Sequence, residues 1–138
     1  MDKELPRDPE GIQKAVECIF AKAQGGDAIL WLGERLGKEV QKVNKTQLRK
    51  FLTELKAIKK DEKFKLDRFR WVSRYIVAQE KSSQEKMPKG MRLLGNYLDV
   101  ATKQVSETYT QERLERLQSL IESVYAHYLY YGEAKEGR

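Results

Sequence analysis

Hydrophobic residues recur at intervals of three and four positions along almost the whole chain, with polar residues between them. This spacing is that of amphipathic α-helices. No segment shows the strict alternation of a half-buried strand, and the β-branched residues are scattered. The pattern predicts an all-α fold, a compact bundle of five to six helices in a single domain over residues 1–138. We expect residues 1–8 and 133–138 to form flexible tails.

The first predicted helix covers residues 9–23. Asp8 is suited to cap it, and the proline that follows suits the first helical position. Cys18 lies in the apolar face of this helix, so we expect it to be a core residue. The Gly-Gly pair at residues 25–26 is expected to stop the helix.

Two more helices follow. Asp27 is expected to cap the second, and Gly33 and Gly37 predict that this helix is short or bent. Asn44 is a good N-cap for the third, and Gln47 stands where a capping box places its second member. The third helix has an apolar stripe of Leu48, Phe51, Leu52, Leu55 and Ile58.

Three further helices complete the pattern. The fourth is predicted from about residue 65 to residue 81, and the polar run SSQEKM connects it to the fifth, which starts at Pro88. Thr110 is expected to cap a long sixth helix that ends at Gly132. The stripe of the fifth helix comprises Leu93, Leu94, Tyr97, Leu98, Ala101 and Val105. The stripe of the sixth comprises Leu114, Leu117, Leu120, Ile121, Val124, Tyr128 and Tyr131.

Charge changes this picture because the net charge of +6 is concentrated in the middle of the chain. Residues 44–105 hold 16 basic and 7 acidic side chains and so carry a net +9, whereas both ends are slightly acidic. Concentrated positive charge attracts polyanions over long range. A lysine-rich surface that serves only solubility is the alternative.

The third helix carries a row of basic residues beside its apolar stripe. Lys45, Arg49, Lys56 and Lys60 fall within about 60° of one another and span roughly 22 Å. Lys50 points away from this row. Like charges repel at this spacing, so the row favours a line of phosphate contacts over a mixed, solvated face.

The fourth helix is apolar over most of its circumference, through residues such as Trp71 and Tyr75. A helix of this kind is central to the packing or faces a partner. Its narrow polar seam holds Arg70, Arg74 and Lys81, within about 40° of one another. Arginine suits phosphate oxygens, but the two arginines can equally pair with acidic residues of neighbouring helices, such as Glu112 or Glu115.

The chain offers little for catalysis. It has one cysteine and one histidine, His127, so a zinc set built from cysteine and histidine is excluded. No phosphate-cradling glycine loop is present. We therefore expect no enzymatic activity, no metal and no cofactor. The charged N-terminus is unlike a signal peptide, and no run is long and apolar enough to span a membrane. A cytoplasmic protein without a membrane partner is expected.

Tyrosines gather near the end of the sixth helix, in the run VYAHYLYYG. Tyr125, Tyr128 and Tyr131 share the apolar arc, which favours a place in the core or in a protein interface over base stacking. Tyr130 points elsewhere and is the ring expected to be most exposed.

The chain resembles a known family in four features together. These are its length and basic all-helical character, the TQLRKF run that opens the third helix, SRYIVAQ in the fourth, and IESVYAHYLYYG at the end of the sixth. Over roughly residues 30–132 it is similar to the small helical subunit of the type III-A CRISPR effector, the Csm complex. Two features depart from the family: the fourth helix reads YIVAQEK where the family usually carries a YAAGR-like run, and the acidic N-terminal helix is less typical.

This resemblance implies a non-catalytic subunit for antiviral defence, present in several copies along the groove that holds guide RNA and target RNA. Other subunits of the Csm complex would be its partners and would cleave the RNA. Within the TQLRKF motif, Leu48 is expected in the core and Arg49 facing RNA. The residues predicted to bind RNA are Lys45, Arg49, Lys50, Lys56, Lys60, Arg70, Arg74 and Lys81.

Two alternative functions stay open. One is the small helical subunit of the related type III-B complex, from which the TQLRKF and VYAHYLYYG motifs argue away. The other is a helical protein-interaction module whose basic face meets an acidic protein. Self-association, as a dimer or between neighbours in a filament, is expected because the apolar fourth helix needs more cover than its neighbours supply.

Overall fold

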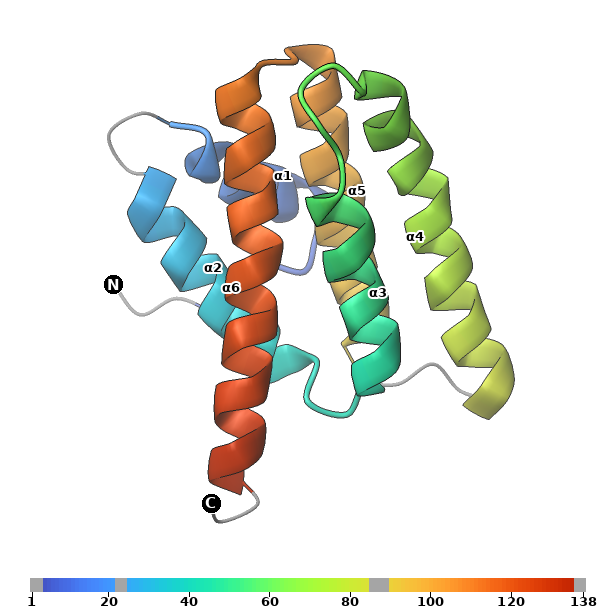
Figure 1. The fold of residues 1–138 in the computed structure, drawn as a ribbon. Helices are drawn as coiled ribbons and strands as arrows, with labels where there is room; N and C mark the ends of the chain where they lie inside the picture. Colours follow the sequence, from blue (N-terminus) through green and yellow to red (C-terminus); the bar gives the residue numbers. More distant parts are fainter. Residues whose placement is uncertain (1–3, 22–24, 85–89, 136–138) are drawn as a thin grey trace.

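The computed structural model describes residues 4–21, 25–84 and 90–135, with only the backbone for 79–84 and 133–135. It contains six helices and, within these ranges, no strand (Figure 1). The prediction of an all-α bundle is therefore confirmed. The helices are α1 (Pro9–Ile19), α2 (Gly25–Glu39), α3 (Lys45–Lys56), α4 (Lys63–Gln84), α5 (Met91–Glu107) and α6 (Gln111–Lys135).

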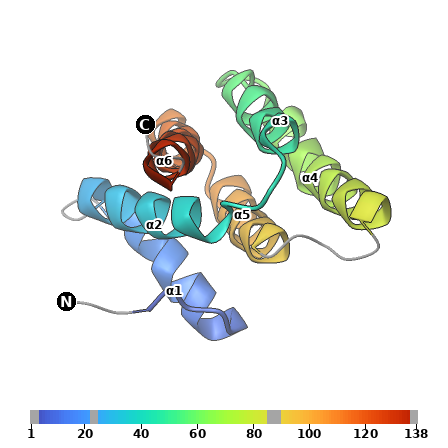
Figure 2. The same cartoon turned by 90° about the horizontal axis from the view of Figure 1, so that it is seen from below.

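The helices pack as two groups joined by α5 and α6. Seen from below, α1 and α2 lie on one side and α3 and α4 on the other (Figure 2). The long α6 packs against both α2 and α3, and α5 packs against both α1 and α4. Every helix therefore has at least two neighbours over which to bury its apolar stripe.

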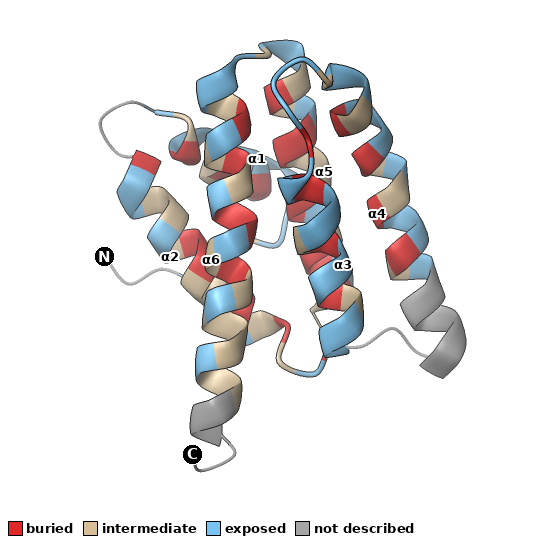
Figure 3. Cartoon of the chain, in the orientation of Figure 1, coloured by how far each residue is buried: buried red, intermediate tan, exposed pale blue. Residues whose placement is uncertain are grey.

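The core runs through the middle of this arrangement, along the inward face of each helix (Figure 3). The stripes predicted for the third, fifth and sixth helices supply most of it, although Leu52, Tyr128 and Tyr131 are only partly buried. The largest fully buried side chains include Leu32, Leu36, Leu48, Phe51, Leu94, Tyr97 and Leu114. Burial of these side chains is the main stabilising term of the fold.

Three predicted helix caps are present. Asp8 accepts a hydrogen bond from the amide of Gly11 at 3.0 Å, and Asn44 accepts from the amides of Thr46 and Gln47 at 2.8 and 3.3 Å. The hydroxyl of Thr110 accepts from the amide of Arg113 at 3.1 Å. The capping box predicted at Gln47 is wrong, because its side-chain oxygen is buried without a hydrogen-bond partner.

The first helix differs from its prediction in two ways. It ends at Ile19, with Phe20 as its C-cap, so it is shorter than the range 9–23. Cys18 is exposed and not a core residue. The buried stripe is formed by Ile12, Val16 and Ile19, and a position two residues after Val16 lies well away from that stripe on a helix.

The glycines of α2 have a packing role that their helix propensity does not reveal. The helix runs for 15 residues from Gly25, so Asp27 lies inside its first turn and is not its cap. A Cβ at Gly37 would lie 2.6 Å from the Cβ of His127 and 2.9 Å from the backbone nitrogen of Tyr128. A Cβ at Gly33 would lie 2.5 Å from the Cβ of Ser123. These glycines let α2 approach α6 closely, and the expectation of a short α2 is wrong.

The N-terminal residues are held against the domain. Leu5 is buried, the hydroxyl of Tyr97 donates to the carbonyl of Pro6 at 2.6 Å, and Arg7 pairs with Glu39 at 3.0 Å. These contacts attach the residues just before α1 to the bundle. Burial raises the pKa of the Tyr97 hydroxyl, which stays a hydrogen-bond donor.

Two further helix ends also differ from their predictions. Pro88, the predicted start of the fifth helix, lies outside the described residues, and α5 begins at Met91 after Gly90, whose φ is 97°. The sixth helix continues past Gly132 to Lys135. In the part of the chain that the structure describes, no helix has the length and apolar character needed to cross a membrane.

The close packing of α2 on α6 can be tested by replacing Gly37 with alanine. In an exposed helix this change stabilises by up to about 1 kcal/mol. Here we expect the free energy of unfolding to fall by about 1–3 kcal/mol, because the new methyl group overpacks the interface. Urea unfolding measures the change. Gly26→Ala is the matched control, because a Cβ there meets nothing within 4 Å, and it should not destabilise the protein.

Candidate nucleic-acid interface

The start of α3 exposes two basic side chains of the predicted row. The Asn44 cap and the buried residues Leu48 and Phe51 fix the rotation of the helix. Lys45 and Arg49 then point to solvent. Neither makes a hydrogen bond or ion pair with any other described residue, so their charges are uncompensated locally.

The other members of the predicted row differ from these two. Lys56 forms an ion pair with Glu122 of α6. Lys60 follows the end of α3, because Ala57 is the C-cap, so it does not continue the helical row. Lys50 is exposed, on a different side of the helix from Arg49. The row of four predicted from helical periodicity is therefore wrong beyond Lys56.

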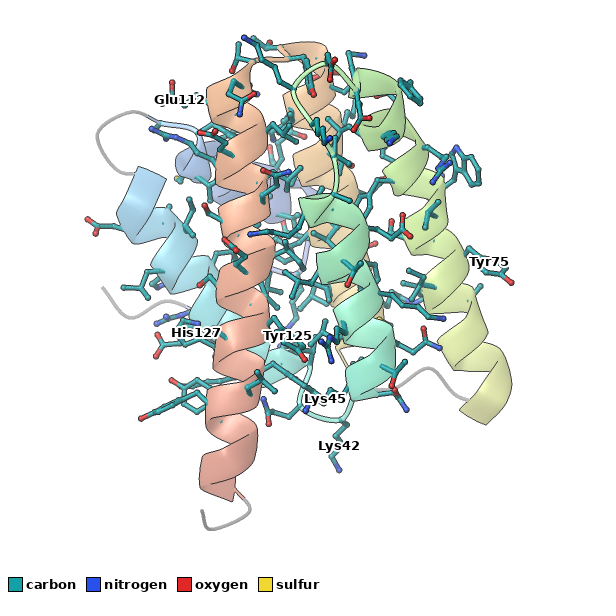
Figure 4. All side chains as sticks on the ribbon, in the orientation of Figure 1. Lys42, Lys45, Tyr75, Glu112, Tyr125 and His127 are labelled. Carbon is teal, nitrogen blue, oxygen red and sulfur yellow. The ribbon has the colours of Figure 1, made fainter. Side chains whose placement is uncertain are left out.

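A shallow, open groove lies between α3 and α6, beside these basic residues. Its volume is about 690 Å³. It is lined by Arg49, Leu52, Thr53, Lys56 and Ala57 of α3 and by Glu122, Tyr125, Ala126 and Leu129 of α6. Figure 4 shows Tyr125 between the two helices, with Lys45 near the lower end of α3. The groove thus combines a basic edge with an apolar and aromatic surface.

The two walls of this groove are joined at both ends of α3. The hydroxyl of Tyr128 donates to the carbonyl of Val43 at 2.8 Å, just before α3 begins. The amide of Gln118 donates to the carbonyls of Leu55 and Ile58, at 3.1 and 3.0 Å, where α3 ends. The bond to Leu55 satisfies a carbonyl that the end of α3 leaves free, and the three bonds together tie α3 to α6.

The basic seam of α4 lies on another side of the molecule and is neutralised in part. Nε of Arg70 donates to Asp99 of α5 at 3.0 Å, and Arg74 donates to the same carboxylate at 3.1 and 3.2 Å. Of the two readings of these arginines, pairing with an acid is what the structure shows. The partner is Asp99, however, and not the suggested acids of the sixth helix, of which Glu112 pairs with Arg116.

The pKa of Asp99 reflects this environment. Burial alone raises the pKa of the carboxyl, but the hydrogen bonds and charges of Arg70 and Arg74 outweigh burial and hold the pKa below its ordinary value. Asp99 is therefore ionised at neutral pH, and the three groups together carry a net charge of +1. Beside them, Ser73, Arg92 and Asn96 complete a small polar pocket between α4 and α5.

The side chain of Lys81, the last residue predicted in this seam, lies outside the described residues. Arg68, which the seam did not include, is exposed and unpaired within the described ranges. It lies one turn before Trp71, on the outer side of α4. The predicted basic residues thus fall on two separate faces, one along α3 and one between α4 and α5.

The outer side of α4 exposes three large aromatic residues, Phe64, Trp71 and Tyr75, each more than 60% accessible. Figure 4 shows Tyr75 pointing away from the bundle. The inner side of the helix buries Leu66, Phe69 and Ile76. The apolar circumference read from the sequence therefore divides into a core face and an exposed face.

The tyrosines of α6 are divided as predicted. Tyr130 is 66% exposed, whereas Tyr125 and Tyr128 stack at 6.1 Å and are partly buried. The hydroxyl of Tyr131 donates to Glu34 at 2.7 Å, and its ring stacks with His127. No group of three metal-ligating side chains occurs among the described residues.

These features define a small, basic, all-helical subunit with a cationic groove and an exposed aromatic face. The family model for Csm2 Type III-A matches residues 25–134 of the chain. The chain therefore belongs to this family and is a small subunit of the type III-A CRISPR effector, the Csm complex, as its motifs suggested. The type III-B alternative is thereby set aside. Neither the curated proteins nor the solved structures include a match.

Replacing Asp99 with asparagine tests the ion pairs of the α4–α5 face. Because folding lowers the pKa of Asp99, these pairs stabilise the protein fully above the ordinary aspartate value of 3.8 and lose that contribution as the pH falls through the lowered value. We expect Asp99→Asn to cost about 1 kcal/mol at pH 7 and much less at pH 2. Urea unfolding at the two pH values measures this. Glu107→Gln, at an exposed and unpaired site of the described chain, should change stability little at either pH.

Proposed function

We propose that this protein is a non-catalytic, RNA-binding structural subunit of its effector complex. In the cytoplasm, several copies would line the groove that holds guide RNA and target RNA, as part of antiviral defence. The observation that carries the proposal is the pair of exposed, uncompensated cations Lys45 and Arg49, at the edge of a groove, in a segment with a net charge of +9. Family membership supports it.

Phosphate is the ligand that suits the α3 edge best. The guanidinium of Arg49 can offer two parallel donors to phosphate oxygens, and Lys45 adds a point charge one turn away. Phosphate contacts of this kind position a protein along RNA without reading its sequence. Binding should therefore tolerate any guide sequence, which a subunit shared by all guides requires.

Arg49 and Lys45 rank first among the predicted RNA contacts. The other predicted residues rank lower when an acidic neighbour offsets their positive charge. Lys50 and Lys60 are exposed and can add to the positive electrostatic potential that attracts RNA. Lys56 is offset by Glu122, and Arg70 and Arg74 share Asp99. We propose these three as weaker contacts, and Lys81 stays a predicted one.

The absence of catalysis is also part of the proposal. Cys18 lies on α1, whereas the Nδ1 atom of His127 on α6 is 2.8 Å from the carbonyl of Ser123. The end of α1 that carries Cys18 meets α6 at Arg116, which donates to the carbonyl of Ile19 at 3.0 Å. His127 lies about three turns further along α6, so the two groups do not form the nucleophile and base pair that covalent catalysis needs. Cleavage of RNA would then belong to other subunits.

Self-association is proposed through the outer face of α4. Exposed aromatic residues in a row mark a protein contact more often than a solvated surface. The face is basic through Arg68, so two copies of α4 would repel each other. The acidic residues exposed on α1 and α6, Glu17 and Glu115 among them, offer a complementary surface. A head-to-tail contact between successive copies satisfies both conditions.

Charge reversal of Arg49 tests the RNA-binding surface. We expect Arg49→Glu to weaken the binding of RNA of any sequence by about tenfold or more at low salt, because it removes one phosphate contact and adds a repulsive charge. Fluorescence anisotropy with two unrelated RNA sequences, over a series of salt concentrations, measures the affinity and its salt slope.

Lys14→Glu is the matched control for this experiment. It changes the net charge equally, but it lies on α1, on the opposite side of the bundle from α3 (Figure 2). If Arg49→Glu binds RNA as tightly as Lys14→Glu does, the α3 surface does not contact the RNA. Displacement of the RNA by an acidic protein, but not by other RNA, would favour the protein-interaction module instead.

The self-association surface is tested by Phe64→Ser with Trp71→Ser. We expect the wild-type protein to show a mass above 16.1 kDa that rises with concentration in light scattering. The double variant should stay a monomer, because the apolar contact is lost. Leu30→Ser is the control, since Leu30 is exposed on α2, away from α4. A wild-type protein that is monomeric at every concentration would contradict the proposal.

A further inference from the structure

The groove between α3 and α6 has a composition that backbone binding does not explain. Its α3 edge carries Arg49 and Lys56, which suit phosphate. The surface behind them is formed by Leu52, Tyr125 and Leu129. A protein that holds RNA through its phosphates alone has no need of an apolar and aromatic surface beside its cations.

The size of the groove limits what it can hold. Its volume of about 690 Å³ lies within the range of roughly 300–1,000 Å³ that is typical of small-ligand sites. The groove is shallow and open, so it suits a unit that remains attached to a longer chain. It does not enclose a free small molecule.

One RNA nucleotide combines the two properties that the groove offers. The base has a flat face that stacks on aromatic side chains, and the phosphate takes a guanidinium. Bases inside a duplex already stack on their neighbours, so the base in question must be unpaired. An apolar peptide would leave Arg49 without a role, and a bare phosphate would leave Tyr125 without one.

We propose that the groove binds one unpaired nucleotide of the bound RNA, with its base against Tyr125 and its phosphate at Arg49. The inference rests on the proposed RNA-binding function and adds a site for a base to it. Lys56 neutralises Glu122 inside the groove, so the carboxylate does not repel the phosphate. The bonds from Tyr128 and Gln118 join the two walls of the groove at both ends of α3.

The site is tested with two RNA duplexes that differ by one unpaired nucleotide in the middle of one strand. The wild-type protein should bind the bulged duplex about fivefold or more tightly than the fully paired one, as expected for one base stacked on an aromatic ring. Tyr125→Phe should keep this preference, and Tyr125→Leu should lose it. Tyr130→Leu, which removes an exposed ring outside the groove, should keep it.

A second measurement uses the wild-type protein, so it does not depend on the folding of a variant. With 4-thiouridine at the bulge, ultraviolet cross-linking followed by peptide mass spectrometry should place the link in residues 45–57 or 122–129. A link elsewhere would overturn the site, as would equal affinity for the two duplexes or a Tyr125→Leu variant that retains the preference. If Arg49→Glu weakens binding to both duplexes while no bulge preference exists, the nucleotide site is wrong and the proposed function stands. If Arg49→Glu affects neither, the proposed function itself fails.

Discussion

The position of α6 is the constraint on which the rest of the structure depends. Glycines at 33 and 37 let α2 pack so closely on one side of α6 that a Cβ at either position would clash with Ser123 or with His127 and Tyr128. On the other side, Tyr128 and Gln118 bind carbonyls before and at the end of α3. One helix thus fixes both groups of the bundle, and it places Glu122 and Tyr125 opposite the basic edge of α3.

This arrangement also decides which positive charges remain available. Asp99 of α5 pairs with Arg70 and Arg74 on one face, and Glu122 of α6 pairs with Lys56 on another. Lys45 and Arg49 lie in the first turns of α3, where no acidic side chain of the described chain pairs with them. The same net charge in the sequence therefore yields one edge whose two cations have no acidic partner among the described residues and one face whose two arginines share a single carboxylate.

Much of the fold could be predicted from local patterns. The caps at Asp8, Asn44 and Thr110 are formed by side chains bonding to amides two or three residues away, so they are visible in a short stretch of sequence. The apolar stripe predicted for α5 is buried as expected, because the helical spacing of its apolar residues allows only one inward face. Cys18 was misplaced because free cysteine is among the most often buried residue types. The rotation of α1 that buries Ile12, Val16 and Ile19 leaves Cys18 exposed.

The sequence by itself determined the helices, their inward faces, the basic middle segment and the motifs that mark the family, because each depends on residues close together in the chain. The tertiary structure alone decided that Asp99 pairs with the α4 arginines, that Gly33 and Gly37 serve close packing, and that Tyr125 lines the same groove as Arg49. These contacts join residues that are tens of positions apart. Their partners depend on how helices pack and rotate, which a helical pattern read one segment at a time does not contain.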